Sequence, residues 1–387
     1  MHGLSGARRG SALQNLGMVQ DGAVLIKDGI VAEVGSTRRL ENLKEARDAL
    51  DIDVHGSVVM PGFVDAGLKI SLRTPGAEVA GGKPKKLGQL YDESLELLRS
   101  CMHHGTLNAE VKGTAAALDF HSDLSVLRRL AKIGNNPVGM IRTWRLAHVP
   151  AAGNETADFK DTLARLSRRG LAHSIEITLG KEEVVSKELL EAAHDARVEI
   201  KLNWTGGTSE ALRNVLSRVN PRAVSCSSSL TRGEAEALAH SESAAVFSPG
   251  YALGRSGGLG ARHAVDAGAA IALSSGYDAE EAPGFSMQMA VSLAVIQEQL
   301  TMEEAISAAT VNAAYAVGCG ETAGTIEKGK RADILVLTLP DYREIPRQFG
   351  INHVGMVFRD GVLVLNRSRW KIGAHEPSSG RVRTQRV

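Results

Sequence analysis

Alternating apolar and polar residues mark two stretches near opposite ends of the chain. Residues 22–36 (GAVLIKDGIVAEVGS) alternate around an Asp28-Gly29 pair, a pattern that predicts a β-hairpin. Residues 332–338 and 354–365 repeat the alternation, and the second of them turns at Asp360-Gly361. We therefore expect both ends of the chain to contribute strands to one sheet.

Between these ends, short apolar runs alternate with amphipathic segments of helical period. Strands are predicted over 62–70, 105–112, 138–146, 174–179, 198–204, 222–226, 244–248 and 269–275. Helices are predicted over 88–103, 122–133, 156–169, 183–195, 207–217, 231–240 and 285–299. Eight strands that alternate with helices are typical of an α/β fold closed into a parallel (β/α)8 TIM barrel, which usually takes about 250 residues.

An open doubly wound sheet would use similar elements, but it normally carries a glycine-rich turn after its first strand. No such turn follows residues 62–70. The densest glycine run, 250–260 (GYALGRSGGLG), comes after the seventh strand, and its spacing matches no dinucleotide-binding fingerprint. We interpret this run as a barrel loop rather than as a phosphate cradle.

The amino-acid composition argues against nucleic acid and membranes as binding partners. The 387 residues include 45 Lys and Arg against 44 Asp and Glu, so no excess positive charge favours nucleic acid or an anionic membrane. Aromatic residues make up 4%, too few for a broad stacking platform. The three cysteines form no CxxC pair, and no apolar run approaches ~18 residues. We expect a cytoplasmic protein that binds neither nucleic acid nor membrane.

Several segments resemble a known family. Residues 56–67 (GSVVMPGFVDAG) lead into the first predicted barrel strand as they do in the amidohydrolase superfamily. A narrower resemblance, to the imidazolonepropionase family that hydrolyses an imidazolone ring, is carried by RRGSALQNLG (8–17), LAHVP (146–150), TMEEAISAATVNAAYAVG (301–318), GTIEKGKRADILVL (324–337) and DYREIPRQFGINHV (341–354).

The resemblance covers nearly the whole chain. It implies a TIM barrel over residues 61–326 and a small β-sandwich domain built from both chain termini, residues 1–60 and 327–387. Compared with the family the chain begins late, which implies that the first sandwich strand is missing and that Met1 is a displaced start.

The resemblance also implies a single metal ion. In the family a His-x-His pair at the end of the first strand, a His on the fifth strand and an Asp on the eighth hold the metal. A His on the sixth strand and a Glu after the fifth handle protons. Such a site produces hydroxide near neutral pH, because the metal lowers the pKa of its bound water.

This sequence departs from the family at each of these positions. Gly67 and Lys69 replace the two histidines, and glycine offers no ligand atom while an ammonium group repels a divalent ion. The positions on strands five, six and eight are occupied by Asn203, Ser228 and Gly276. Residues 204–206 contain no acidic residue where the family has its Glu, and Asp278 alone cannot replace the missing metal ligands. We expect no metal and no catalytic residues for metal-dependent hydrolysis.

Five residues form the predicted binding site for a small anion: Lys69, Lys112, His148, Lys201 and Asn203. The three lysines lie at or near the ends of separate predicted strands, where side chains of a barrel face the site. His148 matches a position at which the family's His faces substrate. The competing interpretation is that Lys112 and Lys201 merely keep positions of the family and pair with carboxylates such as Glu110 or Glu199.

Three hypotheses follow. The leading one is a metal-free, catalytically inactive pseudoenzyme without cofactors, which binds a ligand or serves as an assembly subunit. The runner-up is an active hydrolase on the carbon–nitrogen bonds of a cyclic amide, with Lys69 as electrophile and His148 as base. The third is a binding protein for a small anion. Since the family commonly forms homodimers, we expect a homodimer or an assembly with a related active subunit.

Overall fold

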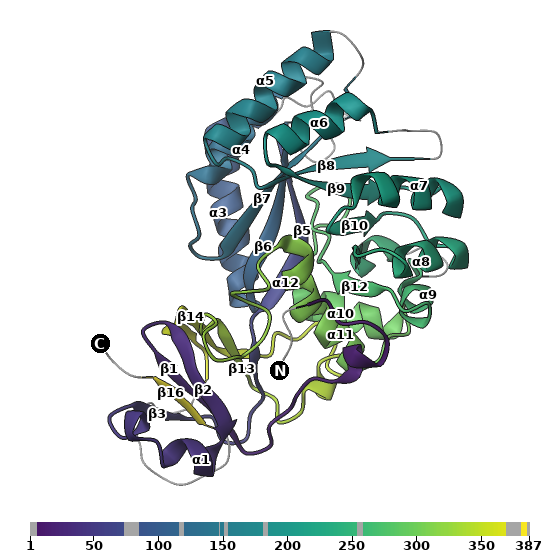
Figure 1. Cartoon of the computed structure of the whole chain (residues 1–387). Coiled ribbons are helices and arrows are strands. Elements are labelled where there is room, and N and C mark those ends of the chain that lie inside the picture. The colour runs from purple at the N-terminus through teal and green to yellow at the C-terminus, as the bar shows by residue number, and fades with distance from the viewer. Residues whose placement is uncertain are drawn as a thin grey trace.

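The computed structural model describes residues 6–72, 85–115, 120–146, 148–150, 154–180, 185–253, 258–368 and 381–384. These residues form a barrel and a smaller, separate β-domain that lies beside one end of it (Figure 1). Residues 254–257 of the glycine-rich run lie outside the described residues.

Eight parallel strands line the barrel in sequence order. They are β5 (Phe63–Ser71), β6 (Thr106–Thr114), β7 (Gly139–Arg145), β8 (Ser174–Leu179), β9 (Glu199–Trp204), β10 (Ala223–Cys226), β11 (Ala244–Phe247) and β12 (Ala270–Leu273). Most of their residues are buried, because helices cover the outer face and side chains fill the interior. The apolar runs predicted all eight strands to within two residues at each end.

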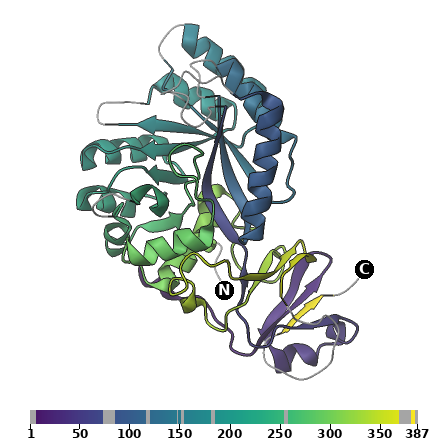
Figure 2. The same cartoon turned by 180° about the vertical axis from the view of Figure 1, so that it is seen from behind.

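Helices surround these strands, and Figure 2 shows them from behind. Those that follow the first seven strands are α3 (Leu87–His103), α4 (Phe120–Ala131), α5 (Asn154–Arg168), α6 (Lys187–Asp195), α7 (Ser209–Val219), α8 (Arg232–Ala239) and α9 (Ala261–Asp266). Those that follow the eighth strand are α10 (Met287–Ile296), α11 (Met302–Ala309) and α12 (Val311–Val317). Capping boxes start two of them, formed by Thr231 with Glu234 and by Thr301 with Glu304.

The first and last barrel strands meet without a strand ladder in the described part of the chain. Asp65, on β5, accepts hydrogen bonds of 3.0 Å from the backbone N–H groups of Gly67 and Ser275. Ser274 donates its hydroxyl to the Gly67 carbonyl at 3.0 Å, and Lys69 N–H donates to the Tyr277 carbonyl at 2.8 Å. These bonds close the barrel next to the residues that resemble the family's ligand positions.

The smaller domain consists of two four-stranded sheets. One has the order β2 (Ile30–Ser36), β1 (Gly22–Lys27), β16 (Arg381–Thr384), β3 (Leu50–Asp53). The other has the order β15 (Val362–Asn366), β14 (Val354–Arg359), β13 (Ile334–Leu337), β4 (Val59–Pro61). Short helical turns lie at α1 (Thr37–Glu41), η2 (Lys44–Ala46) and η4 (Tyr342–Glu344).

The prediction of one shared sheet is wrong in its detail. Both hairpins form, but they lie in different sheets, and each sheet combines strands from both ends of the chain. β16 from the C-terminal end lies between β1 and β3, and β4 from the N-terminal end pairs with β13. Side chains of both sheets, among them Val31, Ile334 and Phe358, pack into one buried core. The β-sandwich built from both termini is therefore present.

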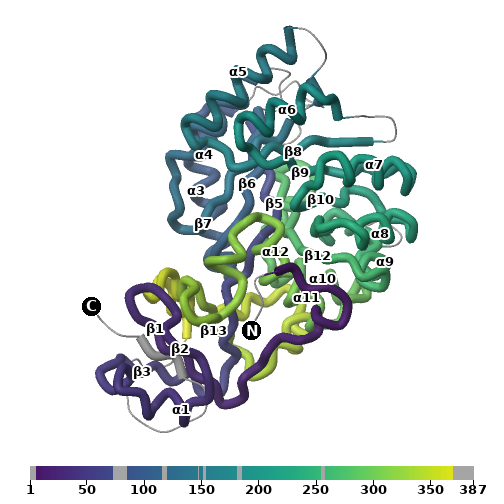
Figure 3. Tube along the Cα trace, viewed as in Figure 1, coloured from purple at the N-terminus to yellow at the C-terminus, as the bar shows by residue number. Residues whose placement is uncertain are grey.

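The N-terminal segment anchors this sandwich to the barrel. Its turn η1 (Gly10–Gln14) lies beside α11, where Figure 3 shows the purple tube running along the barrel toward the sandwich. Asn312 accepts the N–H of Arg8 at 2.7 Å and donates to the Arg8 and Ile271 carbonyls at 2.9 and 2.8 Å. Among the described residues, no helix combines the length and the apolar character needed to span a membrane.

Candidate ligand-binding site at the barrel mouth

A cavity of about 230 Å³ opens at the carboxyl ends of the barrel strands. Each of the eight strands contributes to its wall, either from its last residues or from the residue that directly follows it. One such residue from each strand is Lys69, Lys112, Arg145, Thr178, Asn203, Ser225, Val246 and Ser274. This end of a TIM barrel is where functional residues gather, because loops of variable sequence extend from it.

Four of the positions that resemble metal-ligand positions lie in this one wall: Gly67, Lys69, Asn203 and Gly276. The Ser228 hydroxyl is buried without a hydrogen-bond partner among the described residues, and its neighbour Ser227 lines the cavity instead. The four positions that the sequence motifs matched to metal ligands therefore lie together at the barrel mouth.

A buried charged cluster forms the floor of the mouth. The Lys112 ammonium donates to the Glu176 carboxylate and, at 2.8 Å, to the Ser225 hydroxyl, which itself donates to Glu176 at 3.0 Å. Burial alone would raise the pKa of Glu176, but the charges of Lys112 and Arg145 and the two hydrogen bonds lower it to about 2. Burial alone would lower the pKa of Lys112, but the nearby carboxylates raise it. Both groups are therefore ionised near neutral pH.

Lys69 lies above this cluster in a different environment. Its Nζ donates to the Tyr251 hydroxyl, lies 4.3 Å from the centroid of the Tyr251 ring, and is 3.8 Å from the Asp278 carboxylate. Tyr251 comes from η3 (Pro249–Ala252), directly after β11. Burial, and then the positive charge of Arg145, lower the pKa of Lys69 to about 8. A fifth of the Lys69 side chain remains exposed, so a molecule in the cavity can reach the amine.

Known proteins match this architecture and its sequence. A model described as the amidohydrolase family matches residues 252–364. An imidazolonepropionase of Bacillus velezensis is 29% identical over 411 aligned residues, which cover 95% of this chain and 95% of that protein. An imidazolonepropionase of Parabacteroides distasonis is also 29% identical, and covers 93% of this chain and 95% of its own.

Residues 252–364 thus match the amidohydrolase family, and nearly the whole chain is similar to imidazolonepropionases. Solved structures agree on the fold. Zinc-bound atrazine chlorohydrolase from Arthrobacter aurescens superposes with a TM-score of 0.67 at 15% identity, covering 89% of this chain and 90% of its own. A zinc-bound adenosine deaminase from Xanthomonas campestris gives 0.62 at 15% identity, with 88% of each chain covered.

The side chains at the mouth do not fit the metal ion that the family resemblance implies. A Cβ added to Gly67 would lie 3.1 Å from the Ser274 hydroxyl and 3.3 Å and 3.5 Å from Cε and Nζ of Lys112, so a histidine at residue 67 would stand beside an ammonium group. Lys69 holds a second positive charge at the position of the other histidine. In the described ranges, no three His, Cys, Asp or Glu side chains lie together as a metal site requires.

Asn203 and Lys201 lie at different depths of the barrel. The Asn203 amide donates to the Thr178 hydroxyl at 3.3 Å and accepts the Ser227 hydroxyl at 2.5 Å, within the cavity wall. Lys201 lies two residues earlier, one layer deeper, where its Nζ pairs with buried Glu110 at 2.9 Å. The competing interpretation, pairing with a carboxylate, therefore describes both Lys201, which does not line the cavity, and Lys112, which does and pairs with Glu176.

His148 is also absent from the cavity wall. Its ring stacks on Phe120 with centroids 5.8 Å apart, and its Nε2 is hydrogen-bonded to the Glu155 carboxylate at the start of α5. Of the five residues predicted to bind an anion, the structure thus brings three together at the mouth: Lys69, Lys112 and Asn203.

Three residues at the mouth were missed by sequence reasoning: Arg145, Glu176 and Tyr251. Glu176 carried a usable signal, since a lone carboxylate in the apolar run SIEITL predicts a buried partner. Arg145 ends β7, as Lys112 nearly ends β6, and the same argument from strand ends could have included it. Tyr251 lies in a loop turn, and no pattern in the sequence indicates that it reaches Lys69.

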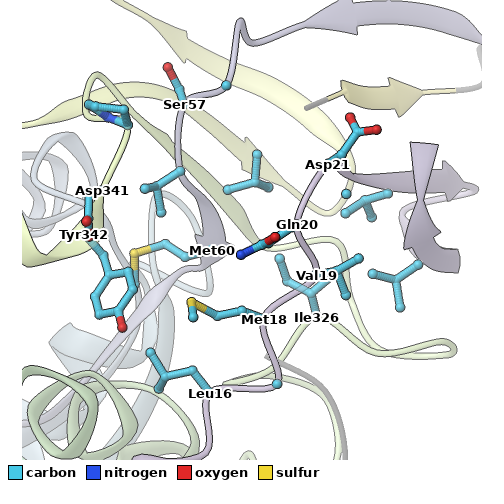
Figure 4. Close-up of a pocket in the computed structure, with 18 of the residues that line it drawn as sticks. Leu16, Met18, Val19, Gln20, Asp21, Ser57, Met60, Ile326, Asp341 and Tyr342 are labelled. Carbon is cyan, nitrogen blue, oxygen red and sulfur yellow. The ribbon is translucent and has the colours of Figure 1, made fainter. Parts of the chain in front are cut away.

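A second cavity, of about 460 Å³, lies where the N-terminal segment passes between sandwich and barrel. Figure 4 shows Met18, Met60 and Ile326 gathered around it, with Tyr342 at one side. Its ionised side chains include Asp341 and Arg343, which pair with each other at 2.7 Å. It is larger than the mouth, but it does not contain buried, convergent charges, so we assign the candidate site to the mouth.

Proposed function

We propose that this protein is a metal-free member of the superfamily whose barrel mouth binds a small carboxylic acid without hydrolysing it. The observation that carries the proposal is the presence of two ammonium groups at the mouth: Lys69 stands at one position where the family resemblance implies a histidine ligand, and Lys112 lies beside the other, Gly67. Cations at these positions exclude a divalent ion by repulsion and attract a negatively charged ligand instead.

The charge balance of the mouth supports an anionic ligand. Lys69, Lys112 and Arg145 carry three positive charges, and Glu176 and Asp278 carry two negative ones. The further carboxylate of Glu281 is exposed at the rim, where water screens it. Because the cationic side chains of the mouth are largely buried, a bound carboxylate stabilises the unbalanced positive charge inside.

The size and polarity of the cavity favour a small acid. Its volume of about 230 Å³ lies below the usual range for drug-sized ligands, about 300–1,000 Å³. Ser225, Ser227 and Asn203 offer hydroxyl and amide groups next to the two cations. The curated relatives are imidazolonepropionases, so imidazolonepropionate, which combines a small ring with a carboxylate, is the first acid to test.

The alternative of an active metal-free hydrolase has weaker support. It assigned Lys69 as electrophile and His148 as base, but His148 does not line the cavity and is hydrogen-bonded to Glu155. A water molecule beside Lys69 would need another base. The carboxylate of Asp278 lies 3.8 Å from Lys69 and is the nearest candidate for this base. It already accepts hydrogen bonds from the N–H groups of Glu280 and Glu281 at 3.0 and 3.4 Å.

Calorimetric titration tests the proposal. Imidazolonepropionate, succinate and glutarate are titrated into the wild-type protein at low and high salt, and the recovered ligand is analysed for ring opening. At least one acid should bind at a single site, with an affinity that falls as salt rises. Lys69→Met should weaken binding by about tenfold or more, since a charge-assisted hydrogen bond contributes about 1.5–3 kcal/mol.

Lys328→Met is the matched control, because Lys328 is an exposed sandwich residue that pairs with Glu33. It should bind the acid as the wild type does. Absence of binding by every acid, equal binding by Lys69→Met, or release of ring-opened product would each contradict the proposal.

A further inference from the structure

We propose that Lys69 is a nucleophile that forms an imine with the carbonyl group of a 2-oxo acid at the barrel mouth. The inference rests on the proposed function, since it takes the same cavity and the same class of ligand, and it adds a covalent step that hydrolysis does not use. It is carried by the surroundings of the Lys69 amine, which differ from those of the other lysines in the barrel.

The amine of Lys69 is both held in place and accessible. Lys112 and Lys201 are almost fully buried, and each is in direct contact with a carboxylate. Lys69 instead has its closest carboxylate, Asp278, 3.8 Å away, and donates to the neutral hydroxyl of Tyr251. It lines the cavity and keeps a fifth of its side chain exposed. Among these three lysines, Lys69 is the one that a ligand carbonyl can approach.

The surroundings also favour the reactive, unprotonated amine. The charged and titratable groups that act on Lys69 are Arg145 from β7, Lys112 from β6, Glu176 from β8, Tyr251 from η3 and Asp278 after β12. Burial and the positive charges outweigh the carboxylates, and the pKa of Lys69 is lowered to about 8. At pH 7 about one amine in ten is then neutral, compared with fewer than one in a thousand for an ordinary lysine.

Tyr251 and Asp278 provide a route for the protons. The Tyr251 hydroxyl contacts Lys69 and lies 3.5 Å from the Asp278 carboxylate, to which it donates. Burial and Asp278 raise the pKa of Tyr251, so the hydroxyl keeps its proton and can pass one along. A tyrosine between an amine and a carboxylate is placed to move a proton between nitrogen and a neighbouring oxygen.

The step balances without an oxidant or reductant. The nitrogen lone pair attacks the carbonyl carbon, a C–N bond forms, and the carbonyl oxygen takes up a proton to give a carbinolamine. The two protons that the neutral amine loses are transferred to that oxygen, which leaves as water while the C=N bond forms. One amine and one carbonyl thus give one imine and one water.

Arg145 explains why the carbonyl compound should be an acid. Its side chain lines the same cavity, and its Nε is buried without a hydrogen-bond partner among the described residues, 3.7 Å from Glu176. A guanidinium group binds a carboxylate through two parallel hydrogen bonds. A 2-oxo acid places a carboxylate directly beside its carbonyl carbon, so one small molecule can engage Arg145 and Lys69 together.

Reductive trapping tests the inference. The full chain is incubated with glyoxylate or pyruvate and sodium cyanoborohydride, and the adduct is located by intact mass and peptide mapping. One adduct per chain should form at Lys69, at a rate that rises with pH through about 8. Lys69→Arg should abolish this adduct, Tyr251→Phe should slow it severalfold, and the control Lys328→Arg should leave it unchanged. Equal labelling of surface lysines, or no difference between wild type and Lys69→Arg, would overturn the inference.

Lactate separates this inference from the proposed function, because it has the carboxylate but no carbonyl. If lactate binds and neither oxo acid gives an adduct, the imine is wrong and acid binding stands. If an adduct forms and lactate does not bind, the imine stands and non-covalent acid binding is wrong. If neither occurs, both are wrong.

Discussion

The ammonium group of Lys112 lies 3.5 Å from the point where a Cβ atom on Gly67 would stand. In a barrel these two residues belong to neighbouring strands, β5 and β6. Glu176 on β8 pairs with the lysine there. A histidine restored at residue 67 would therefore stand beside a buried cation.

Restoring the family's ligands requires more than four substitutions. We expect Gly67→His, Lys69→His, Asn203→His and Gly276→Asp to be the minimum set for hydrolysis, and the structure adds an obstacle at residue 276. Gly276 has a φ of +68°, and a Cβ there would lie 2.5 Å from Cβ of Ser248. Gly276→Ala should therefore lower the free energy of unfolding by more than the 1–3 kcal/mol or so of a strained backbone alone.

Gly134→Ala is the control for this prediction. Gly134 has nearly the same φ, +71°, but nothing lies within 4 Å of the added Cβ. The difference between the free energies of unfolding of the two variants, measured in urea, gives the cost of crowding at residue 276. Equal destabilisation by the two substitutions would show that Ser248 gives way and that residue 276 can accept a side chain.

Glu176→Gln should destabilise the protein strongly near neutral pH. The substitution leaves the Lys112 ammonium buried without its counter-charge, a change that costs about 3–5 kcal/mol. Because the pKa of Glu176 is lowered from 4.5 to about 2, its contribution is complete above pH 4.5 and is lost as the pH falls toward 2. Denaturation curves should therefore show a gap between wild type and variant that narrows over this range.

Glu191→Gln is the matched control, since Glu191 forms an exposed pair with Lys187 on α6. Its effect should stay below about 1 kcal/mol. A Glu176→Gln gap that is equally small, or that does not change between pH 5 and pH 3, would argue against a buried ion pair at the mouth.

Lys69→Met should stabilise the protein near pH 7 and lose this advantage at high pH. The folded protein holds Lys69 with a pKa of about 8, below its usual 10.5, so between these values the unfolded chain binds more protons. Wild-type stability therefore gains from Lys69 as the pH rises through this window, by roughly 2–3 kcal/mol at most, while the variant does not. Chemical denaturation at pH 7 and pH 10.5, with Lys328→Met as baseline, measures the difference. A gap that is constant with pH would contradict a desolvated amine.

Much of the barrel could be predicted because its strands are short, mainly apolar runs that alternate with amphipathic segments. The helices α11 and α12 were not among the predicted helices; they have only eight and seven residues, nearly all of them buried. The four-residue strand β16 has no apolar alternation, and its pairing depends on β1 and β3, which are distant in sequence. Since the sequence does not predict β16, it does not show that the strands of the smaller domain form two sheets rather than one.

At the site, the sequence predicted which residues lie near strand ends, but not how deep in the barrel each side chain lies. Lys201 and Asn203 lie two residues apart on the same side of β9, yet Asn203 reaches the cavity while Lys201 pairs with Glu110 one layer below. His148 lies beyond the end of β7, and its direction is set by stacking on Phe120. Contacts such as Lys69 with Tyr251 join segments 182 residues apart, and only the closed barrel brings them together.

The metal content of the purified protein tests directly whether the barrel mouth is free of metal. The protein is expressed in medium supplemented with zinc, purified without chelators, dialysed, and analysed for zinc, iron and other transition metals against protein concentration. Because Lys69 stands at one ligand position and Lys112 lies beside another, Gly67, we predict far less than one metal ion per chain. Near one equivalent of zinc or iron, lost when Asn203 or Asp278 is substituted, would contradict it.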